Sequence, residues 1–142
     1  MPGSQISIVS DYAGELFGKQ VARNLQEKGL PAVYVGVTSR PFSDGESKEK
    51  VTRSVRGNDV YFICPYQPNP KIRHTEIQFT LSALRYASPN RLVAVPTYLG
   101  FMKQDRKDDA RVAISIREVA QMMELYVDGV ITIDMHLSLI HI

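Results

Sequence analysis

The sequence predicts an α/β domain in which helices flank a mostly parallel sheet, and two observations support this class. Short apolar runs of strand length alternate along the chain with longer segments of helical periodicity. The run Val60-Tyr61-Phe62-Ile63-Cys64 is unbroken apolar, which is typical of a parallel strand covered on both faces. Strands that alternate with helices in this way imply βαβ units with right-handed crossovers.

The first strand and helix are expected near the N-terminus. The residues Ile6-Ser7-Ile8-Val9 indicate a strand, after which Ser10 or Asp11 is expected to cap a helix that runs to about Lys28. Gly29 is suited to end this helix in the left-handed conformation. The expected apolar stripe of the helix comprises Leu16, Phe17, Val21 and Leu25.

The remaining elements follow with the same alternation. The further expected strands are Val33–Val37, a charged peripheral strand or hairpin over 48–55, Val60–Cys64, Leu92–Val95 and Val130–Ile133. The further expected helices run from about Pro70 to Tyr86 and from a capping box at Ser115 and Glu118 along an apolar stripe to Val127. His74 is expected at the helix surface, and Cys64 is expected to be a buried, reduced thiol.

The most informative stretch is the loop from Pro96 to Lys107. It follows the apolar strand Leu92–Val95 and precedes a helix, so it lies at the sheet edge where open α/β folds bind their ligands. Its basic residues would suit an anion such as a polyphosphate; they are Lys103, Arg106, Lys107 and, just beyond, Arg111. Taken alone, the loop is equally compatible with simple solvation, because Asp105, Asp108 and Asp109 partly offset the positive charge.

Length and composition bound the function further. A chain of 142 residues suggests one domain, large enough to bury a core without a disulfide or metal staple. The formal net charge of +2 is too small to indicate a nucleic-acid partner. Asp11 and Glu15 interrupt any signal peptide, and no apolar stretch approaches the roughly 20 residues that span a bilayer. We therefore expect a soluble, cytoplasmic domain without a membrane partner.

Three segments, in order along the chain, resemble the ribose-phosphate diphosphokinase (PRPP synthetase) family. The first is Arg40–Glu46 with Ser54–Val60, the second is Tyr98–Lys107 with Ile114-Ser115, and the third is Ile131–His136. The resemblance implies a phosphoribosyltransferase-like (type I) fold and identifies residues 1–136 as the N-terminal, ATP-binding domain. It also implies a homo-oligomer, in which dimers assemble into a hexamer.

The resemblance implies specific roles for the residues of the three segments. Phe42 would stack on adenine, while Asp44 and Glu46 would accept hydrogen bonds from the base or its ribose. The nucleotide phosphates would be lined by Lys103, Gln104, Asp105 and Arg106. Asp134 and His136 resemble the magnesium-binding pair of the family, and none of the family's catalytic residues falls within this sequence.

The residues themselves leave alternatives open at two of these segments. Asp44-Gly45 has the composition of a plain turn, which could also present Phe42 and Glu46 to a ligand. Without the family context, Asp134-Met135-His136 fits a metal site and a polar strand end equally well. The family usually has arginine where Lys103 stands, and lysine keeps the charge but lacks the bidentate fork.

The resemblance implies an activity that needs more than this sequence. The family transfers diphosphate from Mg²⁺-ATP to C1 of ribose 5-phosphate, and its catalytic lysine, arginine and ribose-phosphate loop lie in a second α/β domain whose motifs are absent here. We expect the fragment alone to be inactive and residues 137–142 to be foreign to the fold, because Leu-Ser-Leu-Ile-His-Ile resembles translated sequencing adapter.

The alternative is a catalytically silent homologue that regulates active synthetases, which Lys103 and the unusual helix start at Asn69–His74 leave open. A phosphoribosyltransferase would show an acidic pair leading into Thr-Gly, which is not found.

Overall fold

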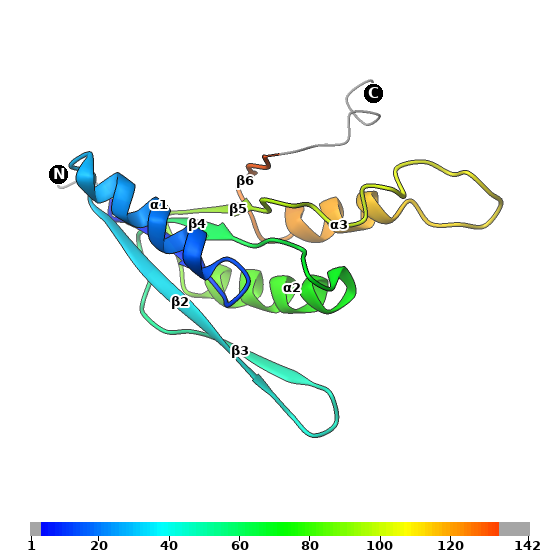
Figure 1. Ribbon diagram of the computed structural model, residues 1–142, viewed down its shortest axis with the longest axis horizontal. Helices are drawn as coiled ribbons and strands as arrows, with labels where there is room; N and C mark the ends of the chain where they lie inside the picture. The colour runs from blue at the N-terminus through cyan, green and yellow to red at the C-terminus, as the bar shows by residue number, and fades with distance from the viewer. Residues whose placement is uncertain (1–3, 134–142) are drawn as a thin grey trace.

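A six-stranded sheet with strand order β3-β2-β1-β4-β5-β6 organises residues 4–133, the part of the chain that this computed structural model describes (Figure 1). The strands are β1 (Ile6–Ser10), β2 (Ala32–Pro41), β3 (Ser47–Val51), β4 (Asp59–Ile63), β5 (Arg91–Val95) and β6 (Gly129–Val130). The helices are α1 (Glu15–Glu27), α2 (Pro70–Tyr86) and α3 (Ser115–Glu124). Every neighbouring pair is parallel except β2–β3, so the predicted α/β class and mostly parallel sheet are confirmed.

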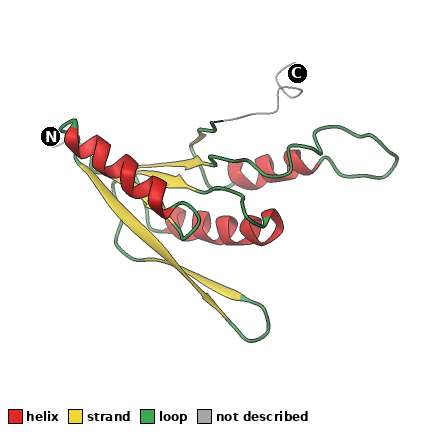
Figure 2. Cartoon of the chain, in the orientation of Figure 1, coloured by secondary structure: helices red, strands yellow, loops and turns green. Residues whose placement is uncertain are grey.

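The helices cover the two faces of the sheet unequally (Figure 2). One face carries α2 and α3, whose side chains pack with those of the central strands into the main core; examples are Phe62, Leu81 and Val119. The other face carries α1 over a smaller cluster centred on Ile8, Ala22 and Ile63. Cys64 is buried in the main core, and burial raises the pKa of its thiol, which agrees with the predicted structural role.

The predicted apolar stripe of α1 is only partly correct. Leu16 is 82% exposed and Phe17 is 42% exposed, while the buried residues of the helix are Gly18 and Ala22. A Cβ atom at Gly18 would lie 3.0 Å from Ser10 Oγ, so the helix approaches the sheet through its small residues. This close approach by the small face leaves Leu16 turned away from the core.

Two of the predicted helix starts are wrong. Gly14, and neither Ser10 nor Asp11, caps α1, because Asp11 Oδ1 instead accepts a hydrogen bond from Ala13 N at 3.0 Å. The residue before α3 is Ile114, no side chain caps that end, and the expected Ser115–Glu118 capping box is not formed. The start of α2 is confirmed, since Asn69 accepts a hydrogen bond from Ile72 N with Pro70 in the first turn.

The end of α1 agrees with the prediction, whereas the last strand differs from it. Gly29 adopts φ +78° just after α1, which confirms its predicted left-handed conformation. The predicted strand Val130–Ile133 is shorter than expected, because β6 covers only Gly129–Val130. Beyond it, Ile131 N still donates to Ala94 O at 2.9 Å and Thr132 Oγ1 donates to Pro96 O at 2.9 Å, so the chain stays beside the end of β5.

The expectations for Asp134, His136 and residues 137–142 lie outside the described residues. Among residues 4–133, none of the helices combines the length and apolarity that a membrane span requires.

Candidate functional site

The strand order reverses between β1 and β4. The chain leaves β1 through α1 toward β2 on one side, and leaves β4 through α2 toward β5 on the other. In open α/β folds, the crevice at the carboxyl ends of such neighbouring strands is the usual ligand site. The side chains in this crevice therefore determine whether a ligand can bind there.

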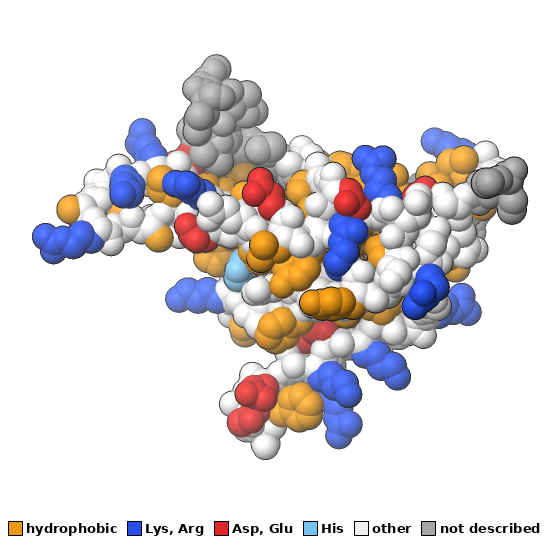
Figure 3. Space-filling model, turned by 180° about the vertical axis from the view of Figure 1, so that it is seen from behind, with side chains coloured by type: hydrophobic (Ala, Val, Ile, Leu, Met, Phe, Trp, Pro, Cys, Tyr) orange, Lys and Arg blue, Asp and Glu red, His pale blue; other side chains and the backbone are white. Residues whose placement is uncertain are grey.

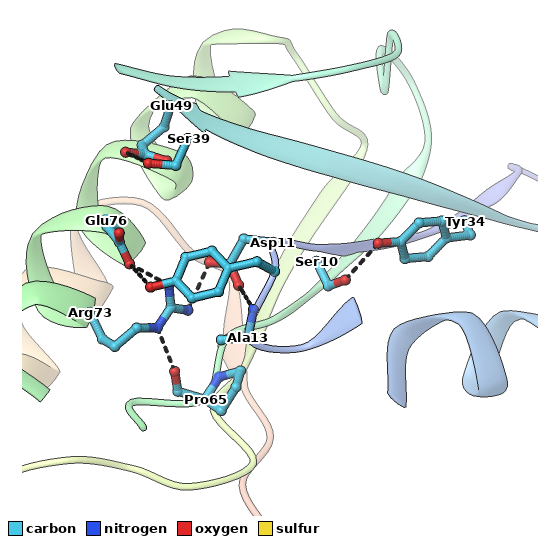
Figure 4. Close-up of polar contacts among 10 residues, drawn as sticks. Ser10, Asp11, Ala13, Tyr34, Ser39, Glu49, Pro65, Arg73 and Glu76 are labelled. Atoms are coloured by element: carbon cyan, nitrogen blue, oxygen red, sulfur yellow. Dashed lines mark hydrogen bonds and ion pairs between the residues drawn. The ribbon is translucent and has the colours of Figure 1, made fainter. Parts of the chain in front are cut away.

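The side chain of Arg73 fills this position (Figure 4). It projects from α2, is fully buried, and lies with Nη2 2.7 Å from Asp11 Oδ2 at the end of β1. Its Nη1 lies 2.6 Å from Glu76 Oε2, and its Nε donates to Pro65 O, just after β4, at 2.9 Å. Tyr12 covers the guanidinium with its ring at 5.2 Å and donates to Glu76 Oε2 at 3.0 Å.

This ion-pair network consists of two carboxylates and one guanidinium. Burial raises the pKa of the Asp11 carboxyl, and the guanidinium of Arg73 opposes that shift. Because two carboxylates flank one guanidinium, Arg73 offers no spare positive charge to a phosphate group. The network thus closes the strand crossover with side chains that are already paired.

The loop between β5 and α3 offers the positive charge that the crossover lacks. It leaves the carboxyl end of β5, as predicted, and its residues project from the body of the domain (Figure 1). Figure 3 shows Lys and Arg side chains gathered over this projecting lobe. Lys103, Gln104 and Arg106 are exposed, and Asp105 is half-buried.

The first part of this loop is tied to the rest of the domain. Tyr98 O accepts a hydrogen bond from Tyr66 N at 3.0 Å, and Gln104 N donates to Phe101 O at 3.1 Å. Ile116 N, in the first turn of α3, donates to Gln104 O at 3.4 Å. The backbone around Lys103 and Gln104 is therefore fixed between the end of β5 and the start of α3.

A second set of expected site residues lies at the tip of the β2–β3 hairpin, which projects separately from the body (Figure 1). Phe42 N donates to Glu46 O at 2.7 Å, and Glu46 N donates to Asp44 Oδ1 at 3.1 Å. Gly45 completes the turn with φ +91°, a conformation that favours glycine. The turn predicted from Asp44-Gly45 is thus confirmed, and it leaves Phe42 44% exposed.

The hollows on the surface have a different character. One of about 740 Å³ lies along α3 and β6, and one of about 380 Å³ lies beside α1. Both are lined mainly by apolar side chains, such as Met123 in the first and Val21 in the second. Within residues 4–133, no group of three or more His, Cys, Asp or Glu side chains is arranged to hold a metal ion.

Sequence reasoning missed two features of this region. The spacing of Arg73 and Glu76 on one helix signals a local ion pair, but nothing in the sequence links them to Asp11. His74, expected at the surface, is half-buried with Nδ1 3.3 Å from the Tyr66 hydroxyl. Tyr66 comes from the segment after β4, and the sequence of α2 alone gives no sign of this contact.

The sheet topology, the flanking helices and the basic loop at the sheet edge define an α/β domain of the phosphoribosyltransferase type. Comparison with solved structures agrees: phosphoribosylpyrophosphate synthetase from Mycobacterium smegmatis matches with a TM-score of 0.83 and 26% identity, over 96% of this chain and 45% of that one. A hypoxanthine-guanine phosphoribosyl transferase from L. donovani shares the fold at a TM-score of 0.55 and 14% identity, over 94% of this chain and 65% of its own.

The sequence comparisons narrow this class to one family. A family model for the N-terminal domain of ribose phosphate pyrophosphokinase matches residues 6–126. A ribose-phosphate pyrophosphokinase of Helicobacter pylori is 36% identical over 91% of this chain and 39% of its own length. Ribose-phosphate pyrophosphokinase A of Dictyostelium discoideum is 34% identical over 96% of this chain and 42% of its own. The chain belongs to the ribose-phosphate pyrophosphokinase family and spans about two fifths of the length of these relatives.

Replacing Arg73 by alanine tests the ion-pair network. The change leaves Asp11 and Glu76 beside each other without their cation, so we expect a loss of about 3–5 kcal/mol in the free energy of unfolding. The measurement is urea denaturation followed by circular dichroism. Arg91→Ala, at an exposed position on β5, is the control and should change stability by about 0.5 kcal/mol or less. Equal losses in the two variants would contradict a stabilising role for the buried network.

His74 should make the stability of the domain depend on pH. Burial lowers the pKa of this imidazole below 6.5, so the folded protein resists a proton that the unfolded chain accepts. Its contribution is complete above the unfolded pKa and is lost as the pH falls from there through the folded pKa. Urea denaturation at about pH 7.5 and about pH 5.5 should show a larger loss for the unaltered chain than for His74→Gln. Identical losses would mean that His74 titrates as if it were in water.

Proposed function

We propose that this chain is the ATP-binding domain of a ribose-phosphate pyrophosphokinase. Such an enzyme would transfer the β,γ-diphosphoryl group of Mg²⁺-ATP to the C1 hydroxyl of ribose 5-phosphate, with AMP as the leaving group. Membership of the family supports the reaction, since the relatives carry that name. The observation that carries the ATP-binding role is the anchored basic loop at the carboxyl edge of the sheet, beside a strand crossover that is closed.

The β5–α3 loop would bind the phosphates. Lys103 and Arg106 supply two exposed positive charges within four residues, and the Gln104 side chain adds an uncharged donor. The reaction needs alignment and charge neutralisation of a polyphosphate more than covalent help from the protein. A loop whose backbone is fixed at Gln104 suits that task, because the alignment is present before the ligand arrives.

Magnesium would bind next to this loop. Asp134 and His136 lie two and four positions beyond Thr132 in the sequence, and the Thr132 hydroxyl donates to Pro96 O at the start of the loop. A carboxylate oxygen such as that of Asp134 is the ligand type that Mg²⁺ prefers, with water and phosphate oxygens completing its shell. When bound, the ion would neutralise charge on the bridging and leaving oxygens of the diphosphoryl group.

The adenine would be held by the hairpin tip of another copy of the chain. Phe42 is exposed on a turn that projects separately from the phosphate loop (Figure 1), and Asp44 and Glu46 belong to the same turn. An exposed aromatic ring on a projecting turn is typical of a surface that a binding partner covers. We therefore propose a symmetric homo-oligomer, dimers that assemble into a hexamer, in which each site combines the hairpin of one subunit with the loop of another.

Loss of the two loop cations should weaken ATP binding. Lys103→Ala combined with Arg106→Ala removes two charge-assisted contacts, and we expect the dissociation constant for Mg²⁺-ATP to rise at least about tenfold. Isothermal titration calorimetry on the 142-residue chain measures this. Arg23→Ala with Lys28→Ala, two exposed positions on or next to α1, removes the same net charge and should leave the affinity nearly unchanged.

A second candidate, a catalytically silent homologue, is favoured by one observation. Lys103 lacks the guanidinium fork that the family usually has at this position. The same titration separates the two candidates. An unaltered chain that binds Mg²⁺-ATP supports the ATP-binding domain, whereas one that shows no binding favours the silent homologue and contradicts the proposal.

Mixing two defective variants tests the shared site. Phe42→Ala should weaken adenine binding, and Lys103→Ala with Arg106→Ala should weaken phosphate binding. A hybrid dimer of the two regenerates one intact site, so the mixture should bind Mg²⁺-ATP more tightly than either variant alone. Calorimetry on the mixture and on both parents measures this, and a mixture as weak as its parents would rule out the sharing of residues between subunits.

A further inference from the structure

The ring of Tyr66 lies directly against the start of the β5–α3 loop. Tyr66 follows β4, is fully buried, and its backbone N–H donates to Tyr98 O. A Cβ atom at Gly100 would lie 2.7 Å from Tyr66 Cδ1, closer than real Cβ atoms approach another atom. Glycine at position 100 therefore allows the loop backbone to approach the Tyr66 side chain this closely.

The next residue of the loop is held in an unfavourable backbone conformation. Phe101 has φ +66°, in the left-handed region that a bulky residue rarely adopts. Its ring packs edge-on against Tyr66 at 6.2 Å and 87°, and against His74 at 6.0 Å and 78° between ring centroids. Such a conformation persists where the surroundings determine it, and here two rings from other parts of the fold do so.

The third ring joins the other two. His74 comes from α2, and its Nδ1 lies 3.3 Å from the Tyr66 hydroxyl. Burial raises the pKa of the Tyr66 phenol and lowers the pKa of the His74 imidazole, which favours the neutral form of each group, and two neutral groups can share this hydrogen bond. The aromatic cluster of Tyr66, His74 and Phe101 thus connects the end of β4, helix α2 and the loop.

We propose that this aromatic cluster positions the phosphate-binding residues of the loop. Lys103 and Gln104 lie two and three residues beyond Phe101, and Gln104 N donates to Phe101 O. Fixing Phe101 therefore fixes the backbone that carries both side chains. The proposal rests on the proposed function for its ligand, Mg²⁺-ATP, but the anchoring of the loop is a property of the chain without any ligand.

Limited trypsin digestion tests the anchoring without a ligand. Trypsin can cut after Lys103, Arg106 and Lys107 in the loop, and after Lys48 and Lys50 in the hairpin, which serve as the reference within each sample. In Phe101→Ala we expect cleavage after Lys103 to rise about fivefold or more relative to the hairpin sites, because the loop opens locally more often. Mass spectrometry of the early fragments measures the ratio.

Two further variants separate anchoring from general loss of packing. Phe101→Tyr keeps the ring and should restore the ratio of the unaltered chain. Phe79→Ala makes the same truncation on α2, where the ring is 47% exposed, and should leave the ratio within about twofold. An unchanged ratio in Phe101→Ala, or an equal rise in Phe79→Ala, would overturn the anchoring role.

Calorimetry with Mg²⁺-ATP tests whether the anchored conformation is the binding one. When a competent conformation is less populated, the apparent dissociation constant rises in proportion, so Phe101→Ala should bind at least about threefold more weakly while Phe101→Tyr retains affinity. Equal affinity of Phe101→Ala and the unaltered chain would overturn the positioning role. Failure of the unaltered chain to bind ATP would contradict the proposed function, and the trypsin ratio alone would then decide whether the cluster anchors the loop.

Discussion

The buried guanidinium of Arg73 is the interaction on which the arrangement of this domain depends. It contacts the end of β1 through Asp11, the end of β4 through Pro65 O, and its own helix through Glu76. A buried charge of this kind is tolerated only where its partners are in place, so the three elements are held in one relative position. The same contacts occupy the strand crossover, where a ligand would otherwise bind.

The helix that closes the crossover, α2, also contacts the loop after β5. With α2 fixed by Arg73, the adjacent His74 is placed against Tyr66, and the two rings receive Phe101 from the loop. Arg73 therefore holds α2 in place, and its neighbour His74 belongs to the aromatic cluster that we propose to position the loop. The buried core is thus connected, through the contacts of these rings, to the exposed loop that carries Lys103.

Much of this structure could be predicted from the sequence, because local patterns determine it. The alternation of strands and helices, the bounds of α2, the turn at Asp44-Gly45 and the place of the basic loop all follow from periodicity and turn chemistry. The errors arise where a distant partner competes with a local preference. Asp11 caps no helix because one of its oxygens accepts from Ala13 N and the other pairs with Arg73, sixty-two positions away. Leu16 is exposed because α1 approaches the sheet through Gly18. The same distinction holds for the candidate site. Its charged residues could be predicted from the sequence, whereas the contacts of the Tyr66 and His74 rings with the loop could not, because they join distant parts of the chain.

The central claim is that the closed crossover directs the nucleotide to the β5–α3 loop. The most direct measurement is a crystal structure of the chain with Mg²⁺ and a non-hydrolysable ATP analogue. We expect the phosphates beside Lys103, Gln104 and Arg106, with the Arg73–Asp11 ion pair intact. Phosphates bound between β1 and β4, with Arg73 displaced from Asp11 to contact them, would contradict it.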